Sequence, residues 1–146
     1  MTELQDFERA LQPDRAPGTD MADGHLAYLE QLAADDGLVL VADADGQPVG
    51  FLVLVIEACD PGNVHLLEGE RRYGWVTDLF VAAKWRSQGI ARRLLERAEA
   101  HCRELGLAAL QIASLADNPA ALRAYDRAGF DAYEITLVKR LRPIDG

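Results

Sequence analysis

The stretch from Trp75 to Leu105 most constrains the fold, because a strand pattern passes almost directly into a long amphipathic helix. Residues 75–81 form an apolar run typical of a buried strand. After a short turn, apolar residues recur at helical spacing up to Leu105, and Gly106 is a typical helix stop. A second apolar run at residues 107–114 predicts a parallel strand, reached through a right-handed crossover. The chain must therefore build an α/β sheet around this unit.

The remaining segments extend this unit into a mixed α/β sheet with helices on both faces. Apolar spacing predicts helices over residues 1–12, about 20–34 and 118–128, and strands over residues 38–41, 49–56 and 133–141. Asp20 is the expected cap of the second helix. Asp45-Gly46 is typical of a tight turn, so the first two strands should form a hairpin.

Length, charge and cysteine content limit the class of protein. A chain of 146 residues suits a single domain, which we expect to span residues 1–146. A net charge of −9 repels phosphate backbones, so we expect no nucleic-acid partner. No apolar run reaches membrane-spanning length and the N-terminus has no signal core, so we expect a cytoplasmic protein without membrane contact. The two cysteines, Cys59 and Cys102, have no metal or redox spacing, and we expect no metal.

The turn between the strand at 75–81 and the long helix has the features of an anion site. The first N–H groups of a helix lack partners and lie at the positive end of its dipole, which suits a pyrophosphate. Gly89 permits close approach of the backbone, small Ala91 leaves the first turn uncrowded, and Arg86 adds a positive charge. The spacing matches neither a dinucleotide fingerprint nor a triphosphate loop. A helix start that merely needs small residues is the alternative.

The segment from Asn118 to Phe130 forms a second pattern. Asn118 is a good helix cap and Pro119 a good first helical residue. Gly129 is expected to end the helix in a left-handed conformation, with Phe130 packing back onto it. Tyr125 lies within this helix, where a lone tyrosine is usually a core residue. Each of these residues therefore also has a capping or packing explanation.

Together the two segments resemble the GNAT (Gcn5-related N-acetyltransferase) superfamily, over about residues 36–141. The family signature R/Q-x-x-G-x-G/A is met by Arg86-Ser-Gln-Gly89-Ile-Ala91. The second motif, N-x-x-A-x-x-x-Y-x-x-x-G-F, is met by Asn118, Ala121, Tyr125, Gly129 and Phe130. Ser87 stands where the family often has glycine, and Ala91 replaces the commoner glycine. Both are small, so cofactor binding should survive.

The resemblance implies a centrally splayed sheet and transfer of an acetyl group from acetyl-CoA to a primary amine, by direct attack in a ternary complex. Residues 74–130 would form the acetyl-CoA-binding core, and the helices within residues 1–35 would form the acceptor side. The implied cofactor-binding residues are Leu79, Phe80, Val81, Arg86, Ser87, Gln88, Gly89, Ile90, Ala91, Arg92, Asn118 and Tyr125.

The resemblance also implies catalytic roles. Tyr125 matches the family tyrosine that protonates the leaving thiolate, although it could instead only pack against the pantetheine arm. Asp78, on the strand beside the acyl site, is our first choice of general base. The alternatives are Thr77, at a position where some relatives have Glu, together with Glu57 and His65. Asp78 could instead pair with an arginine, and Glu57 and His65 could simply be solvated.

Acceptor specificity should come from the N-terminal helices and from the acid-rich loop at residues 57–73, which predicts a small cationic amine. A protein or peptide acceptor is the rival substrate class. A non-catalytic acyl-CoA-binding module, another phosphate- or nucleotide-binding domain and a structural interaction protein are the rival functions. An exposed sheet edge would allow a homodimer.

Overall fold

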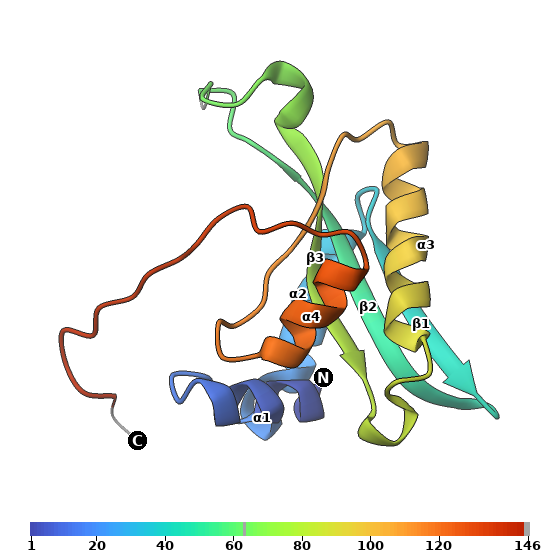
Figure 1. Ribbon diagram of the computed structural model, residues 1–146, viewed down its shortest axis with the longest axis vertical. Helices are drawn as coiled ribbons and strands as arrows, with labels where there is room; N and C mark the ends of the chain where they lie inside the picture. The colour runs from blue at the N-terminus through green and yellow to red at the C-terminus, as the bar shows by residue number, and fades with distance from the viewer. Residues whose placement is uncertain (63, 145–146) are drawn as a thin grey trace. The chain divides into compact units, whose positions relative to one another are not determined.

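The computed structural model describes residues 1–62 and 64–144, and these divide into two units, Met1–Ala22 with Ser114 onward, and Asp23–Ala113. The helices and strands are α1 (Thr2–Leu11), α2 (Gly18–Ala33), β1 (Leu38–Ala44), β2 (Gln47–Ala58), β3 (Arg72–Val81), α3 (Ile90–Glu104), β4 (Leu110–Ile112) and α4 (Pro119–Arg127) (Figure 1). Single 3₁₀ turns lie at Glu68–Glu70 and Ala83–Trp85. One domain over residues 1–146 stays a prediction, and Asn63, Asp145 and Gly146 lie outside the described residues.

The second unit is built on a four-stranded sheet in the order β1-β2-β3-β4. β1 and β2 pair antiparallel around Asp45 and Gly46, whose φ angles of 53° and 77° suit a hairpin turn. β2 and β3 are also antiparallel, whereas β3 and β4 are parallel. The expected hairpin, the parallel crossover through α3 and the mixed α/β sheet are therefore confirmed.

The core of this unit is centred on the middle of β2 and includes the apolar face of α3 and two residues of α2, Leu29 and Ala33. Leu52, Val53 and Leu54 have no exposed surface. The buried residues of α3 are those that the helical spacing predicts: Leu94, Leu95, Ala98 and Cys102. Burial of such side chains is the main favourable term in folding.

A β-bulge at Thr77 reverses the two faces of β3. Val76 pairs with Leu54 and Asp78 pairs with Val53, so Thr77 is an extra residue with no partner opposite it in β2. Because side chains alternate between faces along a strand, one extra residue turns everything after it to the other side. Asp78 therefore faces away from the side of Val76.

The two faces of β3 meet different helices. A Cβ placed on Gly74, on the same face as Val76, would touch the Cys102 sulfur of α3. Asp78, beyond the bulge, instead lies against His25 of α2. The sheet of the second unit thus has helical residues on both sides, as expected.

The contact at Gly74 predicts a stability effect. An added Cβ would meet Cys102 and lie 3.1 Å from Leu110 and 3.3 Å from Leu54, so there is no room for a methyl group. We expect Gly74→Ala to lower the free energy of unfolding by about 1–3 kcal/mol, measured by denaturant titration. Gly24→Ala, in α2 with nothing within 4 Å, is the matched control and should raise it by about 0.5–1 kcal/mol. Wild-type stability of Gly74→Ala would contradict this packing.

The start of α2 corrects the expected cap at Asp20. The helix begins two residues earlier, at Gly18, whose N–H donates a hydrogen bond of 2.7 Å to the Asp6 carboxylate of α1. A capping side chain normally accepts such a hydrogen bond from the position just before the helix, and here Asp6 of α1 accepts it instead. Asp20 lies in the first turn, where its negative charge favours the helix dipole.

The strand predicted over residues 133–141 is wrong in the described part of the chain. Residues 131–140 have no regular secondary structure and are exposed throughout. Ile135, Leu137 and Leu141 are 83%, 89% and 90% exposed. Alternating apolar residues favour a strand only where a neighbouring strand accepts their hydrogen bonds. β4 is likewise shorter than the predicted 107–114.

Candidate functional site

The sheet opens between β3 and β4. The two strands pair only from Gly74 to Val76, opposite Leu110 to Ile112, whereas β3 continues to Val81. The edge of β3 that faces away from β2 is therefore unpaired with β4 beyond Val76. Such an edge presents backbone N–H and C=O groups that an extended ligand can pair with. This splay lies where the sequence places the cofactor residues Leu79, Phe80 and Val81.

The turn after β3 leads into an open helix start. Ser87 and Gly89 have φ angles of 62° and 80°, and this pair of left-handed residues turns the chain into α3 at Ile90. Gly89 is the N-cap and makes no side-chain cap hydrogen bond, so the first-turn N–H groups keep their positive end for another acceptor. Nothing lies within 4 Å of where a Gly89 Cβ would stand. The turn from Arg86 to Arg92 is thus shaped to receive an anion.

Arg86 ties this turn to the strand before it. Its Nε donates a hydrogen bond of 3.0 Å to the carbonyl of Val81, and its guanidinium carbon lies 5.8 Å from the centre of the Phe80 ring. These contacts hold the start of the turn against the end of β3. They also fix the positive charge beside the open helix start.

Asp78 lies where β3 parts from β4, and its side chain is only 10% exposed. Its Oδ1 is buried without a hydrogen-bond partner among the residues that the structure describes. Burial raises the pKa of the Asp78 carboxyl above its usual value, and the neighbouring Thr77 and His25 side chains lower it in part. A buried carboxyl with a raised pKa at a sheet opening is a typical functional-site group.

His25 is the residue that sequence reasoning missed. Its Nε2 lies 3.8 Å from Oδ1 of Asp78, and its side chain is 34% exposed. Nothing near His25 in the sequence marks it, because the contact joins α2 to a strand far along the chain.

The other candidate bases lie in less suitable places. The Thr77 hydroxyl donates a hydrogen bond of 3.3 Å to the carbonyl of Val53, so it stabilises the bulge. Glu57 is exposed and pairs with Tyr73, at the opposite end of β3 from Val81. His65 is exposed in the loop after β2. Asp78 is the carboxylate that the structure places at the opening.

The second motif forms α4 in the first unit, with both ends closed as predicted. The Asn118 Oδ1 accepts a hydrogen bond of 3.2 Å from the Ala121 N–H. At the other end Gly129 has a φ of 93°, and the Phe130 N–H donates to the carbonyl of Tyr125 at 3.0 Å. This is the Schellman arrangement that the sequence suggests. The local geometry of the motif is therefore confirmed.

Tyr125 is held in a defined place on α4. Its ring meets the Phe130 ring edge to face, with centroids 6.1 Å apart. Burial raises the pKa of the Tyr125 phenol, and the negative charge of Glu8 raises it further. The hydroxyl thus stays protonated at neutral pH and can act as a hydrogen-bond or proton donor.

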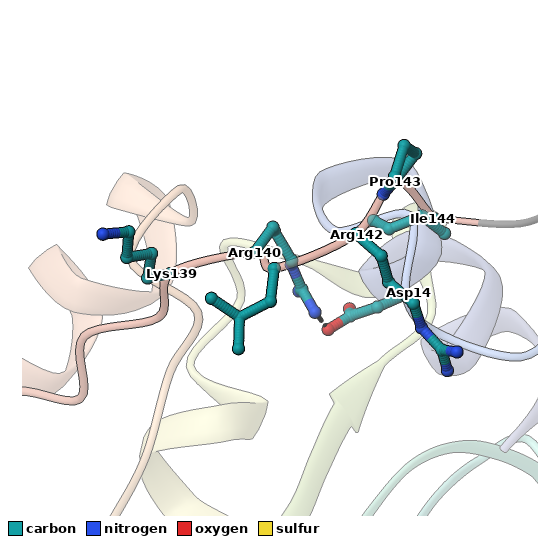
Figure 2. Close-up of a pocket in the computed structure, with 7 residues that line it drawn as sticks. Asp14, Lys139, Arg140, Arg142, Pro143 and Ile144 are labelled. Atoms are coloured by element: carbon teal, nitrogen blue, oxygen red, sulfur yellow. Dashed lines mark hydrogen bonds and ion pairs between the residues drawn. The ribbon is translucent and has the colours of Figure 1, made fainter.

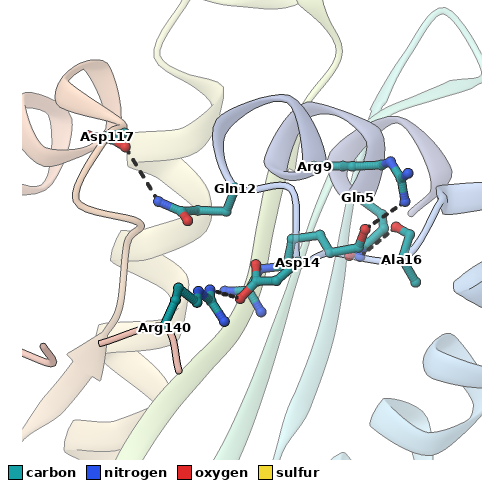
Figure 3. A network of polar contacts seen from close by, with 8 residues as sticks. Gln5, Arg9, Gln12, Asp14, Ala16, Asp117 and Arg140 are labelled. Atoms are coloured by element: carbon teal, nitrogen blue, oxygen red, sulfur yellow. Dashed lines mark hydrogen bonds and ion pairs between the residues drawn. The ribbon is translucent and has the colours of Figure 1, made fainter. Parts of the chain in front are cut away.

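Polar contacts fix the loop that follows α1 in the same unit (Figure 3). The Gln12 side chain reaches Asp117, just before α4, at 3.4 Å, and Arg140 pairs with Asp14 at 2.6 Å. The second contact borders a cavity of about 450 Å³ lined by Asp14 and residues 139–144 (Figure 2). None of the predicted catalytic or cofactor residues lines it.

The described residues give no sign of a metal centre or of a membrane-spanning helix. They contain no group of three or more His, Cys, Asp or Glu side chains placed to hold a metal ion. Within residues 1–62 and 64–144, every helix is too short or too polar to cross a membrane.

Comparison with known proteins identifies the family. An uncharacterised N-acetyltransferase of Methanocaldococcus jannaschii is 28% identical over 112 residues, covering 73% of this chain but only 46% of the relative, so the chain spans less than half of that protein. An aminoglycoside N-acetyltransferase solved with CoA is 22% identical with a TM-score of 0.66, covering 83% and 88% of the two chains. A Bacillus halodurans protein is 17% identical with a TM-score of 0.82, covering 97% and 88%. At these identities the two structures show a shared fold.

Residues 3–130 match the family model described as Acetyltransferase (GNAT) family. The chain therefore belongs to the GNAT acetyltransferase family.

Proposed function

We propose that the protein transfers an acetyl group from acetyl-CoA to a primary amine, with both substrates bound at once. The observation that carries this proposal is the opening of the sheet after Val76, followed on the same strand by the open helix start at Gly89. An extended arm can pair with the first feature while a pyrophosphate binds the second. Family membership supports acetyl-CoA as the donor.

The cofactor-binding residues divide by the part of acetyl-CoA that each would hold. The backbone of Leu79, Phe80 and Val81 would pair with the pantetheine arm. The N–H groups of the turn would bind the pyrophosphate, from Arg86, Ser87, Gln88, Gly89, Ile90, Ala91 and Arg92. Asn118 caps α4 and thereby fixes the helix that carries Tyr125.

The transfer itself needs a proton removed and a proton supplied. The attacking amine must be neutral, because an ammonium has no lone pair for the thioester carbonyl. We propose that the Asp78 carboxylate promotes this deprotonation. Tyr125 is the proposed acid for the leaving thiolate, supported by its place in the motif and by its raised pKa.

The proposed acceptor is a small cationic amine. The chain carries a net charge of −9, which attracts cations to its surface. Exposed acidic residues gather near the end of β2 and in the loop after it, namely Glu57, Asp60, Glu68 and Glu70. The similarity to an aminoglycoside N-acetyltransferase supports the same class of acceptor.

A thermal-shift assay with acetyl-CoA, CoA and NAD side by side tests the cofactor. Ligand at about 100 times its Kd should stabilise the fold by about 2.7 kcal/mol. We expect this rise with acetyl-CoA and CoA and none with NAD. An equal rise with NAD would indicate a general phosphate site, and no rise with any of them would remove the proposed cofactor site.

A transfer assay with radiolabelled acetyl-CoA then tests the acceptor. Spermidine and kanamycin represent cationic small amines, and a lysine-containing peptide and an aryl acid represent the rivals. Faster labelling of spermidine or kanamycin than of the peptide is the expected result. Preference for the peptide would replace the small-amine acceptor while keeping the transferase activity.

A further inference from the structure

His25 on α2 lies next to the Asp78 carboxylate at the opening of the sheet. His25 and Asp78 belong to the same unit, and their facing atoms, Nε2 and Oδ1, are 3.8 Å apart. The Tyr28 ring, one helical turn along α2, also faces the imidazole, with 6.4 Å between the two ring centroids. Asp78 is thus the charged partner that the structure gives to this imidazole.

The two side chains differ in what a substrate can reach. Oδ1 of Asp78 has no accessible surface and no hydrogen-bond partner in the described part of the chain. A buried carboxylate oxygen without a partner is costly, and the imidazole Nε2 lies 3.8 Å from it, near enough for a small rotation to bring an N–H toward it. His25, by contrast, keeps 34% of its side chain exposed. The imidazole is therefore the more exposed member of the pair.

We propose that His25 takes the proton from the acceptor amine and that Asp78 positions it, an inference that rests on the transferase function proposed above. With Nε2–H directed at Asp78, Nδ1 keeps its lone pair and is the proton acceptor. The carboxylate also stabilises the imidazolium that forms. His25 is the catalytic group in this arrangement, and Asp78 is a positioning residue.

The step balances without a further reagent. An N–H bond of the acceptor ammonium breaks and its proton moves to Nδ1 of His25, leaving a neutral amine. The amine lone pair forms a C–N bond to the thioester carbonyl, and the C–S bond breaks. The thiolate takes the Tyr125 proton, the remaining excess proton on nitrogen returns to Tyr125, and the imidazolium releases its proton to water.

The test compares His25→Gln, His25→Ala and Asp78→Asn with wild type, using spermidine and kanamycin as acceptors. His25→Gln keeps an N–H donor but has no basic nitrogen, so kcat should fall by about 10²–10⁴-fold while the acetyl-CoA thermal shift is unchanged. Added imidazole should restore part of the activity of His25→Ala. Asp78→Asn should also lower kcat, and imidazole should not restore it.

His101→Gln is the matched control. His101 lies on α3, where its Nε2 is 2.7 Å from the carbonyl of Asp36, so it has a structural role away from the opening. We expect wild-type kcat from this variant.

Each outcome separates this inference from the function on which it rests. Wild-type activity with either acceptor, together with undiminished kcat in His25→Gln, would overturn the role of His25 and leave the transferase standing. A loss that imidazole does not reverse, accompanied by a weaker acetyl-CoA shift, would show a structural role only and also overturn it. If wild type labels no acceptor at all, the proposed function fails and this inference fails with it.

Discussion

Tyr125→Phe is expected to lower kcat by about 10²–10⁴-fold while acetyl-CoA binds as in wild type. The substitution removes only the hydroxyl, so the edge-to-face contact with Phe130 stays in place. A thiolate that leaves without a proton donor raises the barrier of the transfer, whereas ground-state binding loses little. Steady-state kinetics with spermidine or kanamycin, and a thermal shift with acetyl-CoA, measure the two quantities separately.

Tyr133→Phe is the control for this prediction. Tyr133 lies in the same unit, is 68% exposed and follows α4 by a few residues. It should lose no activity. If Tyr125→Phe also kept wild-type kcat, Tyr125 would be a packing residue and the acid would have to be sought elsewhere.

Gly89→Val is expected to abolish most acetyl-CoA binding in a protein that still folds. The φ of 80° at Gly89 belongs to a region that β-branched residues avoid, so valine would distort the turn. Its side chain would also project into the space that we propose for the pyrophosphate. A 100-fold weaker Kd would reduce the thermal shift from about 2.7 to about 0.4 kcal/mol at the ligand concentration given above.

The fold should survive this change, because no atom lies within 4 Å of the new Cβ. The cost is local backbone strain of about 1–3 kcal/mol, which a melting curve without ligand would measure. Gly62→Val, in the loop after β2 and likewise with nothing within 4 Å, should bind acetyl-CoA normally. Normal binding by Gly89→Val would mean that the turn does not hold the pyrophosphate.

Features whose partners lie close together in the chain could be predicted from the sequence. Asn118 caps the third residue after it, and Gly129 and Phe130 close the same short helix. The buried face of α3 follows from spacing within one helix. In each case the stabilising contact is made inside the segment that shows the pattern, so periodicity and capping rules are sufficient.

Features that depend on distant partners could not be predicted. The cap of α2 comes from Asp6 in another helix, which is why Asp20 was the wrong choice. The run from Trp75 to Val81 carries no mark of the bulge at Thr77, because the register is set by β2. The same bulge brings Asp78 to His25, so the sequence alone does not indicate that these two residues meet. Residues 133–141 lacked the neighbouring strand that their alternation assumed.

Because of the extra residue in β3, the two halves of this strand face different surroundings and can be changed independently. Before Thr77, Gly74 and Val76 face α3, and any change there is limited by the volume of the core. After it, Asp78 and Phe80 face the other side, where replacements alter chemistry and shape without repacking that core. A laboratory library confined to Asp78, Phe80 and the exposed positions of α2, with the buried Leu29 and Ala33 unchanged, could therefore search for new acceptors without repacking the layer beneath α3. If Thr77 instead paired regularly with Val53, Asp78 would lie opposite Leu52 and its carboxylate would face the apolar layer beneath α3.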